Sequence, residues 1–239
     1  MANTQTELGH NRTGAATSPK LTQEMIAGAQ EFAPAPNGDE NIIARVREEY
    51  ARDAEPLGSL PPPATLTGAA KTALRGAKGL RPTQFIDKLG ERLAFERTGV
   101  RLYGALLSKF DAYGSFEGGP QREALVDIMN EEYQHFTLLS NAVAQLGGDP
   151  TVVTPSADLH ATMTAGVMAV MVDPRTTFTQ CLEAALIAEL ADNAAWEVLS
   201  ELATQNGEDA LAAQFEVART EEVAHLENVK SWLAMAQKR

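Results

Sequence analysis

Apolar residues recur every three or four positions along four long stretches of the chain, a spacing that places them on one face of an α-helix. These stretches cover residues 83–113, 120–146, 174–206 and 208–237. We expect Thr83 to cap the first helix and Asp173 to cap the third, with Pro174 in its first turn. Gly147 and Gly148 predict the end of the second helix.

The links between these helices predict how they are connected in space. The first and last links are short, so each pair of neighbouring helices is expected to form an antiparallel hairpin. Residues 147–172 join the two pairs, and this link is long enough to cross the length of a bundle. The sequence therefore predicts an all-α fold, with a four-helix bundle over residues 83–239 and one long crossover connection.

The part of the chain before the bundle has a different composition. Residues 1–40 are rich in Thr, Asn, Gly, Ala and Pro, and we expect a flexible arm with one short helix over residues 21–32. Residues 41–82 predict further short helices that pack on the bundle or link to it.

Charge and composition exclude several kinds of partner and site. The formal net charge of −12 over 239 residues disfavours nucleic acid and anionic lipid as partners. The single cysteine, Cys181, excludes an internal disulfide and a metal site of four thiolates from one chain. The longest apolar run, residues 161–172, is shorter than the ~20 residues of a membrane-spanning helix. The polar first 20 residues lack the apolar core of a secretory signal, so we expect a cytoplasmic protein.

Two segments, residues 131–135 and 221–225, share the pattern Glu-Glu-x-x-His. In each, the second glutamate and the histidine lie three positions apart and therefore on one helix face. Both pairs stand where the surrounding stripe otherwise has apolar residues. Charged side chains are rarely buried unless they are paired or bind a metal ion, so the pattern predicts a site for two metal ions.

The other two helices each supply one glutamate on the apolar stripe, with an aromatic residue seven positions later. Glu96 is followed by Tyr103, and Glu189 by Trp196. The matching Glu-x-x-His pair begins 36 residues after Glu96 and 33 residues after Glu189. This pattern indicates an internal duplication of a helical hairpin. The two hairpins together supply four carboxylates and two imidazoles.

With these residues the chain resembles the ferritin-like superfamily, and most of all the di-iron domains of bacterioferritin and rubrerythrin, over residues 83–237. The resemblance implies six metal ligands: Glu96, Glu132, His135, Glu189, Glu222 and His225. The glutamates of the two Glu-x-x-His pairs would bridge the ions, the other two would be terminal ligands, and each histidine would bind one ion. Two iron ions are implied, with two manganese ions or a mixed manganese–iron pair as alternatives.

Several neighbouring residues have predicted supporting roles. Tyr103 is the candidate catalytic residue and is expected to form a hydrogen bond with a ligand carboxylate. Glu131 and Glu221 lie about 100° around the helix from the ligands, so we expect them to face solvent or bond to other helices without affecting metal content. Asp192 and Asn193 are predicted either to orient a ligand histidine or simply to pack.

The resemblance implies a di-iron carboxylate oxidase that oxidises Fe(II) with O2 or hydrogen peroxide. The alternatives are a di-metal oxygenase or oxidase of an organic substrate, a manganese catalase-like activity, and a non-enzymatic metal-binding stress protein. An apolar pocket of roughly 300 Å³ or more that reaches the metals would favour an organic substrate. The chain lacks the four cysteines of a rubredoxin module, and Tyr133 stands where bacterioferritin has its haem-binding methionine. The expected partners are metal ions and O2 or peroxide, and a homodimer or higher homo-oligomer is compatible with the fold.

Overall fold

The computed structural model describes residues 19–31, 40–60, 66–77, 79 and 82–238. Within these ranges the regular structure consists of eight α-helices with no strand, so the prediction of an all-α fold is confirmed. The chain divides into two compact units, one holding α1 and α2 and the other holding α3 to α8. Much of the predicted N-terminal arm, residues 1–18 and 32–39, lies outside the described residues.

The first unit contains the two short helices that the sequence predicted. They are α1, Pro19–Glu31, and α2, Glu40–Asp53. No residue of α1 is buried, and the apolar side chains of α2, among them Ile42, Ile43 and Tyr50, are exposed.

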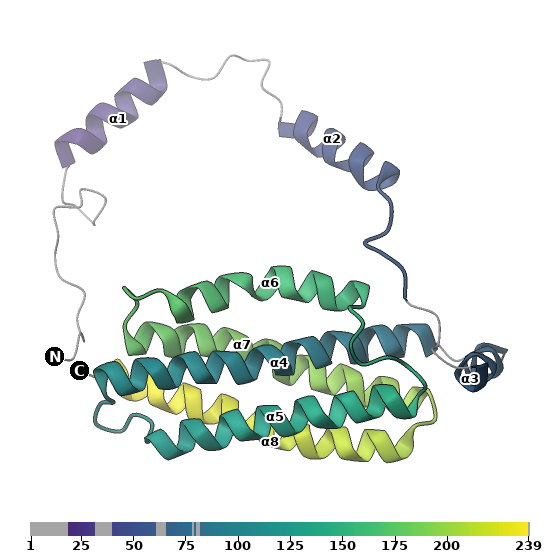
Figure 1. The fold of residues 1–239 in the computed structure, drawn as a ribbon. Helices are drawn as coiled ribbons and strands as arrows, with labels where there is room; N and C mark the ends of the chain where they lie inside the picture. Colours follow the sequence, from purple (N-terminus) through teal and green to yellow (C-terminus); the bar gives the residue numbers. More distant parts are fainter. Residues whose placement is uncertain (1–18, 32–39, 61–65, 78, 80–81, 239) are drawn as a thin grey trace. The chain divides into compact units, whose positions relative to one another are not determined.

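The second unit contains six helices, five of which are packed along one another (Figure 1). They are α3, Leu66–Ala77; α4, Pro82–Tyr113; α5, Arg122–Gln145; α6, Pro155–Val172; α7, Phe178–Gln205; and α8, Asp209–Ala236. Helices α4 and α5 form one hairpin and α7 and α8 the other, while α6 occupies most of the long link and packs against both α4 and α7. Among the described residues, no helix is both long enough and apolar enough to cross a membrane.

Two of the predicted helix starts are wrong. Helix α7 begins at Phe178, and its N-cap is Thr177, whose side chain and that of Gln180 form a reciprocal capping box. Asp173 instead ends α6, and its carboxylate binds the side chain and backbone of Arg175 in the intervening turn. Helix α4 begins one residue before Thr83, with a proline in its first position, where a missing N–H costs nothing.

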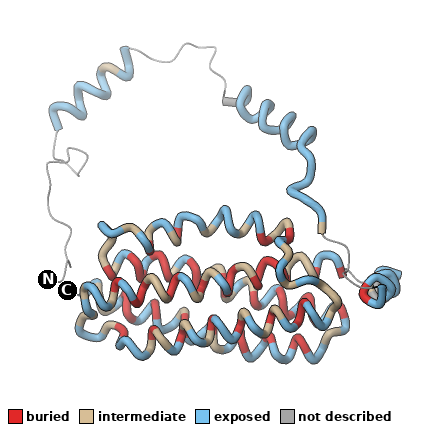
Figure 2. The backbone as a smooth tube through the Cα atoms, in the orientation of Figure 1, coloured by how far each residue is buried: buried red, intermediate tan, exposed pale blue. Residues whose placement is uncertain are grey.

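The apolar core of this unit is split into two clusters. One cluster includes Leu106, Leu125, Leu182 and Val229, and the other includes Leu89, Leu139, Leu199 and Phe215. Each of the four long helices contributes to both clusters, and buried residues follow the inward side of each helix (Figure 2). On α5, α7 and α8 the predicted ligands lie in the sequence between the residues of the two clusters, and on α4 Glu96 directly follows Phe95 of the first cluster. A polar layer therefore adjoins both clusters.

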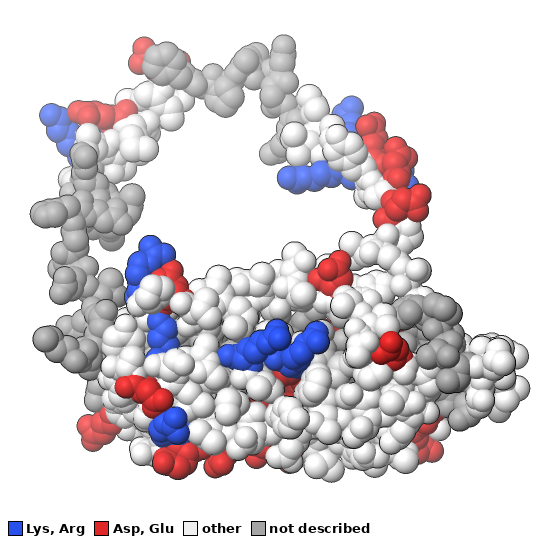
Figure 3. All heavy atoms as spheres, in the orientation of Figure 1, with Lys and Arg blue, Asp and Glu red and all other residues white. Residues whose placement is uncertain are grey.

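The surface over α4 to α6 is mostly uncharged on the side that Figure 3 shows. Basic side chains gather there over the middle of α4. This local excess of positive charge contrasts with the formal net charge of −12 of the whole chain.

Candidate metal centre

The polar layer contains all six of the predicted metal ligands. Each of these side chains is buried, with at most 2% of the residue exposed: Glu96, Glu132, His135, Glu189, Glu222 and His225. Their burial confirms the helix phase expected from the sequence, because all six share the inward face with the apolar core.

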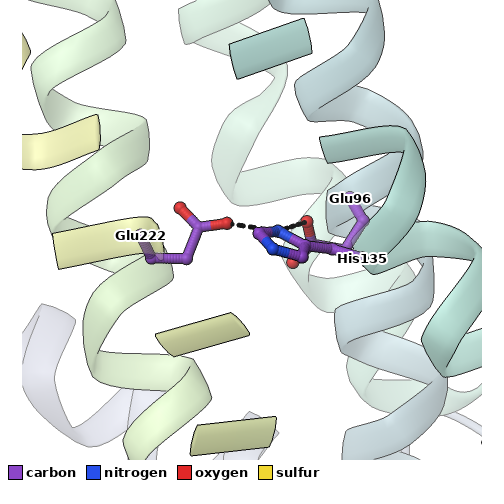
Figure 4. Close-up of side chains that lie close together, drawn as sticks. All are labelled: Glu96, His135 and Glu222. Carbon is purple, nitrogen blue, oxygen red and sulfur yellow. Dashed lines mark ion pairs between the residues drawn. The ribbon is translucent and has the colours of Figure 1, made fainter. Parts of the chain in front are cut away.

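The first group that could hold a metal ion combines three helices. Glu96 of α4, His135 of α5 and Glu222 of α8 each offer one ligand atom, and these atoms lie within 4.8 Å of one another. The imidazole of His135 lies between the two carboxylates (Figure 4). Its Nδ1 is 2.7 Å from Oε1 of Glu222 and 3.6 Å from Oε2 of Glu96.

A second group of the same kind lies beside the first and shares Glu222 with it. Its other members are Glu132 of α5 and His225 of α8. Nδ1 of His225 is 3.2 Å from Oε2 of Glu222 and 3.8 Å from Oε1 of Glu132. The Glu222 carboxylate therefore offers one oxygen to each histidine, which is the placement of a group that bridges two cation positions.

Glu189 is buried in the layer but belongs to neither of these groups. The hydroxyl of Tyr103 donates a hydrogen bond to Oε1 of Glu189, which matches the predicted contact between this tyrosine and a ligand carboxylate. The aromatic residue at the corresponding place on α7, Trp196, packs edge-on against His135 with 5.5 Å between the ring centroids.

The first glutamate of each Glu-Glu-x-x-His segment contacts the histidine of the other segment. Glu131 Oε2 lies 2.7 Å from Nε2 of His225, and Glu221 Oε2 lies 2.7 Å from Nε2 of His135. Of the two predicted alternatives, bonding to another helix is therefore the one observed. A carboxylate on Nε2 holds the ring in place and leaves Nδ1 directed at the buried carboxylates.

This contact changes the expected effect of substituting these two residues. We now predict that Glu131→Gln or Glu221→Gln lowers metal affinity roughly 10- to 100-fold, the usual effect of losing a partner of a ligand histidine. Competition titrations with a chelator would measure the affinity. Glu123→Gln, an exposed position on α5, is the matched control. Unchanged affinity in both variants would restore the original expectation that these glutamates are dispensable.

Arg92 is a buried cation that was not among the residues predicted from the sequence. The residue is 1% exposed, forms ion pairs with Glu96 and Asp192, and lies over the ring of Phe95 at 4.5 Å. Its position four residues before Glu96, on the same helix face, is the sequence signal that indicates this pairing.

Neither of two polar residues on α7 orients a ligand histidine. Asp192 forms its ion pair with Arg92. The side-chain amide of Asn193 donates to the backbone oxygens of Glu189 and Glu222, at 3.0 and 2.9 Å, and so joins α7 to α8. The alternative of a packing role is the one that the structure supports for Asn193.

The close approach of α4 and α5 depends on a glycine. A Cβ atom at Gly99 would overlap the carboxylate of Glu132, with 2.7 Å to its Cδ. Glycine at this position therefore makes the space that the Glu132 carboxylate occupies.

The carboxylates and imidazoles shift one another's pKa values. Burial lowers the pKa of His135, but the carboxylates of Glu222 and Glu96 outweigh it and raise this pKa to about 10. Burial also lowers the pKa of His225, and the Glu222 carboxylate is the main cause that raises it to about 9. Burial raises the pKa of Glu222, yet the two imidazoles lower it to about 2. The metal-free protein thus holds a carboxylate between two imidazolium groups.

Two other glutamates have raised pKa values. Burial, followed by the charges of Glu222 and Glu96, raises the pKa of Glu132 well above its usual value. Burial and Glu222 raise the pKa of Glu189 to about 8, against the lowering effects of His225 and Tyr103. Three groups of the layer, His135, His225 and Glu189, have pKa values above 7 and therefore carry a proton near neutral pH that a metal ion would displace.

Each of the four buried glutamates keeps one carboxylate oxygen that accepts no hydrogen bond from the described part of the chain. These atoms are Glu96 Oε2, Glu132 Oε2, Glu189 Oε2 and Glu222 Oε1. Glu222 Oε1 lies 2.7 Å from Nδ1 of His135 and forms an ion pair with it rather than a hydrogen bond of regular geometry. Buried polar atoms normally have a hydrogen-bond partner, so the remaining oxygens, on Glu96, Glu132 and Glu189, fit ligands for a cation.

One small cavity is lined by candidate ligands. Its volume is about 10 Å³, and Glu132, Glu189 and Asp192 line it together with Thr164 and Val167 of α6. A cavity of about 270 Å³ between α4, α6 and α7 reaches Arg92 but none of the six candidate ligands. An apolar pocket of about 250 Å³ lies elsewhere, between the start of α4 and the end of α5, and none of the six candidate ligands lines it.

Comparison with family models, with curated proteins and with solved structures finds no match to this chain.

Proposed function

We propose that the polar layer binds two divalent metal ions, held by Glu96, Glu132, His135, Glu189, Glu222 and His225. The observation that carries this proposal is that four buried glutamates each keep one oxygen that accepts no hydrogen bond, although one of these oxygens, Glu222 Oε1, forms an ion pair with His135. Glu222 is placed to bridge, because it belongs to both histidine-containing groups and also to a third group, which it forms with Glu96, Glu132 and Asp192. Glu189 would join as the fourth carboxylate through its free oxygen.

The charges of the layer support two divalent ions. With all carboxyl groups ionised, the four glutamates and Asp192 contribute five negative charges and Arg92 one positive charge, which leaves four negative charges in a buried space. Two divalent cations neutralise these four charges. An unbalanced buried charge is costly, so this count favours two divalent ions over one.

The ligand set supports iron or manganese. Carboxylate oxygens and imidazole nitrogens suit these metals, and the only cysteine, Cys181, packs in one of the apolar clusters. We infer that the second unit is a ferritin-like bundle with a di-iron centre, and that two manganese ions or a mixed pair are its alternatives.

We propose that this centre reacts with O2 or hydrogen peroxide. A bound pair of Fe(II) ions would supply two electrons, one from each ion, to reduce hydrogen peroxide to two water molecules with uptake of two protons. The cavity beside the ligands, about 10 Å³, has room for about one water-sized molecule, since a water needs roughly 10–15 Å³. This size supports a small oxidant over the alternative of an organic substrate.

The chain's own groups around the site have separate roles in this proposal. The Tyr103 hydroxyl holds the Glu189 carboxylate in the wall of the cavity. Arg92 fixes one oxygen of Glu96 and leaves the other free. Glu131 and Glu221 hold the two imidazoles. Tyr103 also lines the cavity, so it is placed to affect the reaction with oxidant as well as the position of the ligand Glu189.

Metal stoichiometry and reactivity test the proposal together. Metal-free protein is titrated anaerobically with Fe(II), and the bound metal is counted by elemental analysis before hydrogen peroxide is added. We expect two Fe(II) ions to bind per chain. One molecule of hydrogen peroxide should then oxidise both ions. Glu183→Gln, an exposed site on α7, is the control and should behave as the wild type. Less than one ion bound per chain would refute the metal centre, and two ions that do not react would leave a non-enzymatic metal-binding protein.

A further inference from the structure

The small cavity beside Glu132 and Glu189 lies directly beneath α6. Thr164 and Val167 of α6 line it from one side, and residues of α4 and α7 line the rest. Helix α6 therefore separates the inner end of this cavity from the surface.

A second cavity of about 170 Å³ lies between α4 and α6. It shares three lining residues with the inner cavity: Phe95, Thr98 and Thr164. These three side chains separate the two cavities, so the outer cavity lies next to the inner one between α4 and α6.

The side chains of this partition offer few polar groups to a passing molecule. The Thr98 hydroxyl donates to the backbone oxygen of Ala94 at 3.0 Å, and the Thr164 hydroxyl donates to that of His160 at 2.9 Å. Phe95 is packed between the Arg92 guanidinium and the edge of the His160 ring. A hydrated metal cation would have to lose water here without gaining ligands, which is costly, whereas O2 or hydrogen peroxide is uncharged.

The outer cavity is also lined by two exposed arginines, Arg97 and Arg101, one turn apart on α4. Neither forms an ion pair with a described residue, and they lie in the stretch of α4 over which Figure 3 shows basic side chains gathered. Two uncompensated positive charges at the entrance repel cations and do not oppose a neutral molecule.

We propose that the gap between α4 and α6 is the entrance for a small uncharged oxidant, and that metal cations do not enter by it. Phe95, Thr98 and Thr164 form its narrowest part, and Arg97 and Arg101 form its mouth. The inference rests on the proposed function in one respect, since the oxidant is taken to react at the metal centre. It goes beyond that function by assigning the route and the class of molecule admitted.

The first test blocks the partition with a larger side chain. In Thr164→Phe, we expect the rate of oxidation of the Fe(II)-loaded protein by hydrogen peroxide to fall at least about tenfold, because the added ring fills the path. Uptake of Co(II) by the metal-free variant, followed by its visible absorbance, should keep the wild-type rate. Thr162→Phe is the matched control, because Thr162 is exposed and lies about 200° around α6 from Thr164.

Two outcomes of this test would overturn the proposal. One is an oxidation rate in Thr164→Phe equal to that in Thr162→Phe. The other is an equal slowing of oxidation and of Co(II) uptake, which would mean that both species share one route.

A second test needs no bound metal and so separates the entrance from the proposed function. Ala188 lines the inner cavity, and Ala188→Cys in a Cys181→Ser background places a single thiol there. Hydrogen peroxide converts a thiolate to a sulfenate, as an S–O bond forms, the O–O bond breaks and water leaves. We expect mass spectrometry to detect oxidation of this thiol by hydrogen peroxide. We expect the same thiol to react little with a cationic methanethiosulfonate.

Adding Thr164→Phe to this background should slow the oxidation at least about tenfold, for the same steric reason. An unchanged rate would refute the entrance even if the protein binds no metal. Slow oxidation in Thr164→Phe, in a protein that fails to bind Fe(II), would support the entrance and refute the metal centre.

Discussion

Replacing Glu222 with alanine is expected to abolish the binding of both metal ions. Glu222 is fully buried and is the member that the two ligand groups share, with one oxygen 2.7 Å from His135 and the other 3.2 Å from His225. Its loss would remove a ligand from each ion and leave two imidazoles without the carboxylate between them. Elemental analysis after anaerobic loading with Fe(II) and removal of free metal should find close to no iron.

Two further variants make this result specific. Glu227 is exposed on the same helix, so the Glu227→Ala variant should retain two ions. Glu132→Ala removes a member of only one of the two histidine-containing groups, so we expect it to retain more metal than Glu222→Ala. If Glu222→Ala bound as much iron as Glu227→Ala, the shared carboxylate would not be a ligand.

Metal affinity is expected to rise steeply with pH, because metal ions must displace protons from the site. The pKa is about 10 for His135, about 9 for His225 and about 8 for Glu189, and it is well above the usual value for Glu132. A group with a raised pKa is protonated below that pKa and can bind a metal ion only after it loses the proton. The displacement therefore costs most at low pH and becomes progressively easier as pH rises through 8 to 10.

Near pH 7 the three groups with pKa values of about 8 to 10, His135, His225 and Glu189, predict the release of about three protons per pair of ions bound, and the raised pKa of Glu132 acts in the same direction. Calorimetric titrations in buffers with different ionisation enthalpies would count them. Glu189→Gln should lower the count by about one, since this position then has no proton to lose. Release of no protons, or affinity that falls as pH rises from 6 to 9, would contradict the assignment.

The division of the core explains how the site can be both charged and rigid. Leu125 and Val229 belong to the apolar cluster on one side of the polar layer, and Leu139 and Phe215 belong to the cluster on the other side. Close packing on both sides restrains the ligand side chains, so a metal ion would meet groups that are already in place.

Local pattern along the sequence determined the helices and the inward face of each one. The three-to-four spacing places Glu132 and His135 on the stripe of α5, and Glu222 and His225 on that of α8, and these four are buried as predicted. The errors at this level are helix starts such as Asp173, where several residues can cap and only the contacts that form decide between them.

The tertiary structure alone decided which side chains meet across helices. Glu131 contacts His225, Glu221 contacts His135, and Tyr103 donates a hydrogen bond to Glu189. Spacing along one helix cannot predict these contacts, because they depend on the axial offset and rotation of each helix relative to its neighbours. The same holds for the pairing of Arg92 with Asp192. The position of a residue around its own helix determines whether it is buried. The packing of the whole unit determines which partner a buried charge contacts.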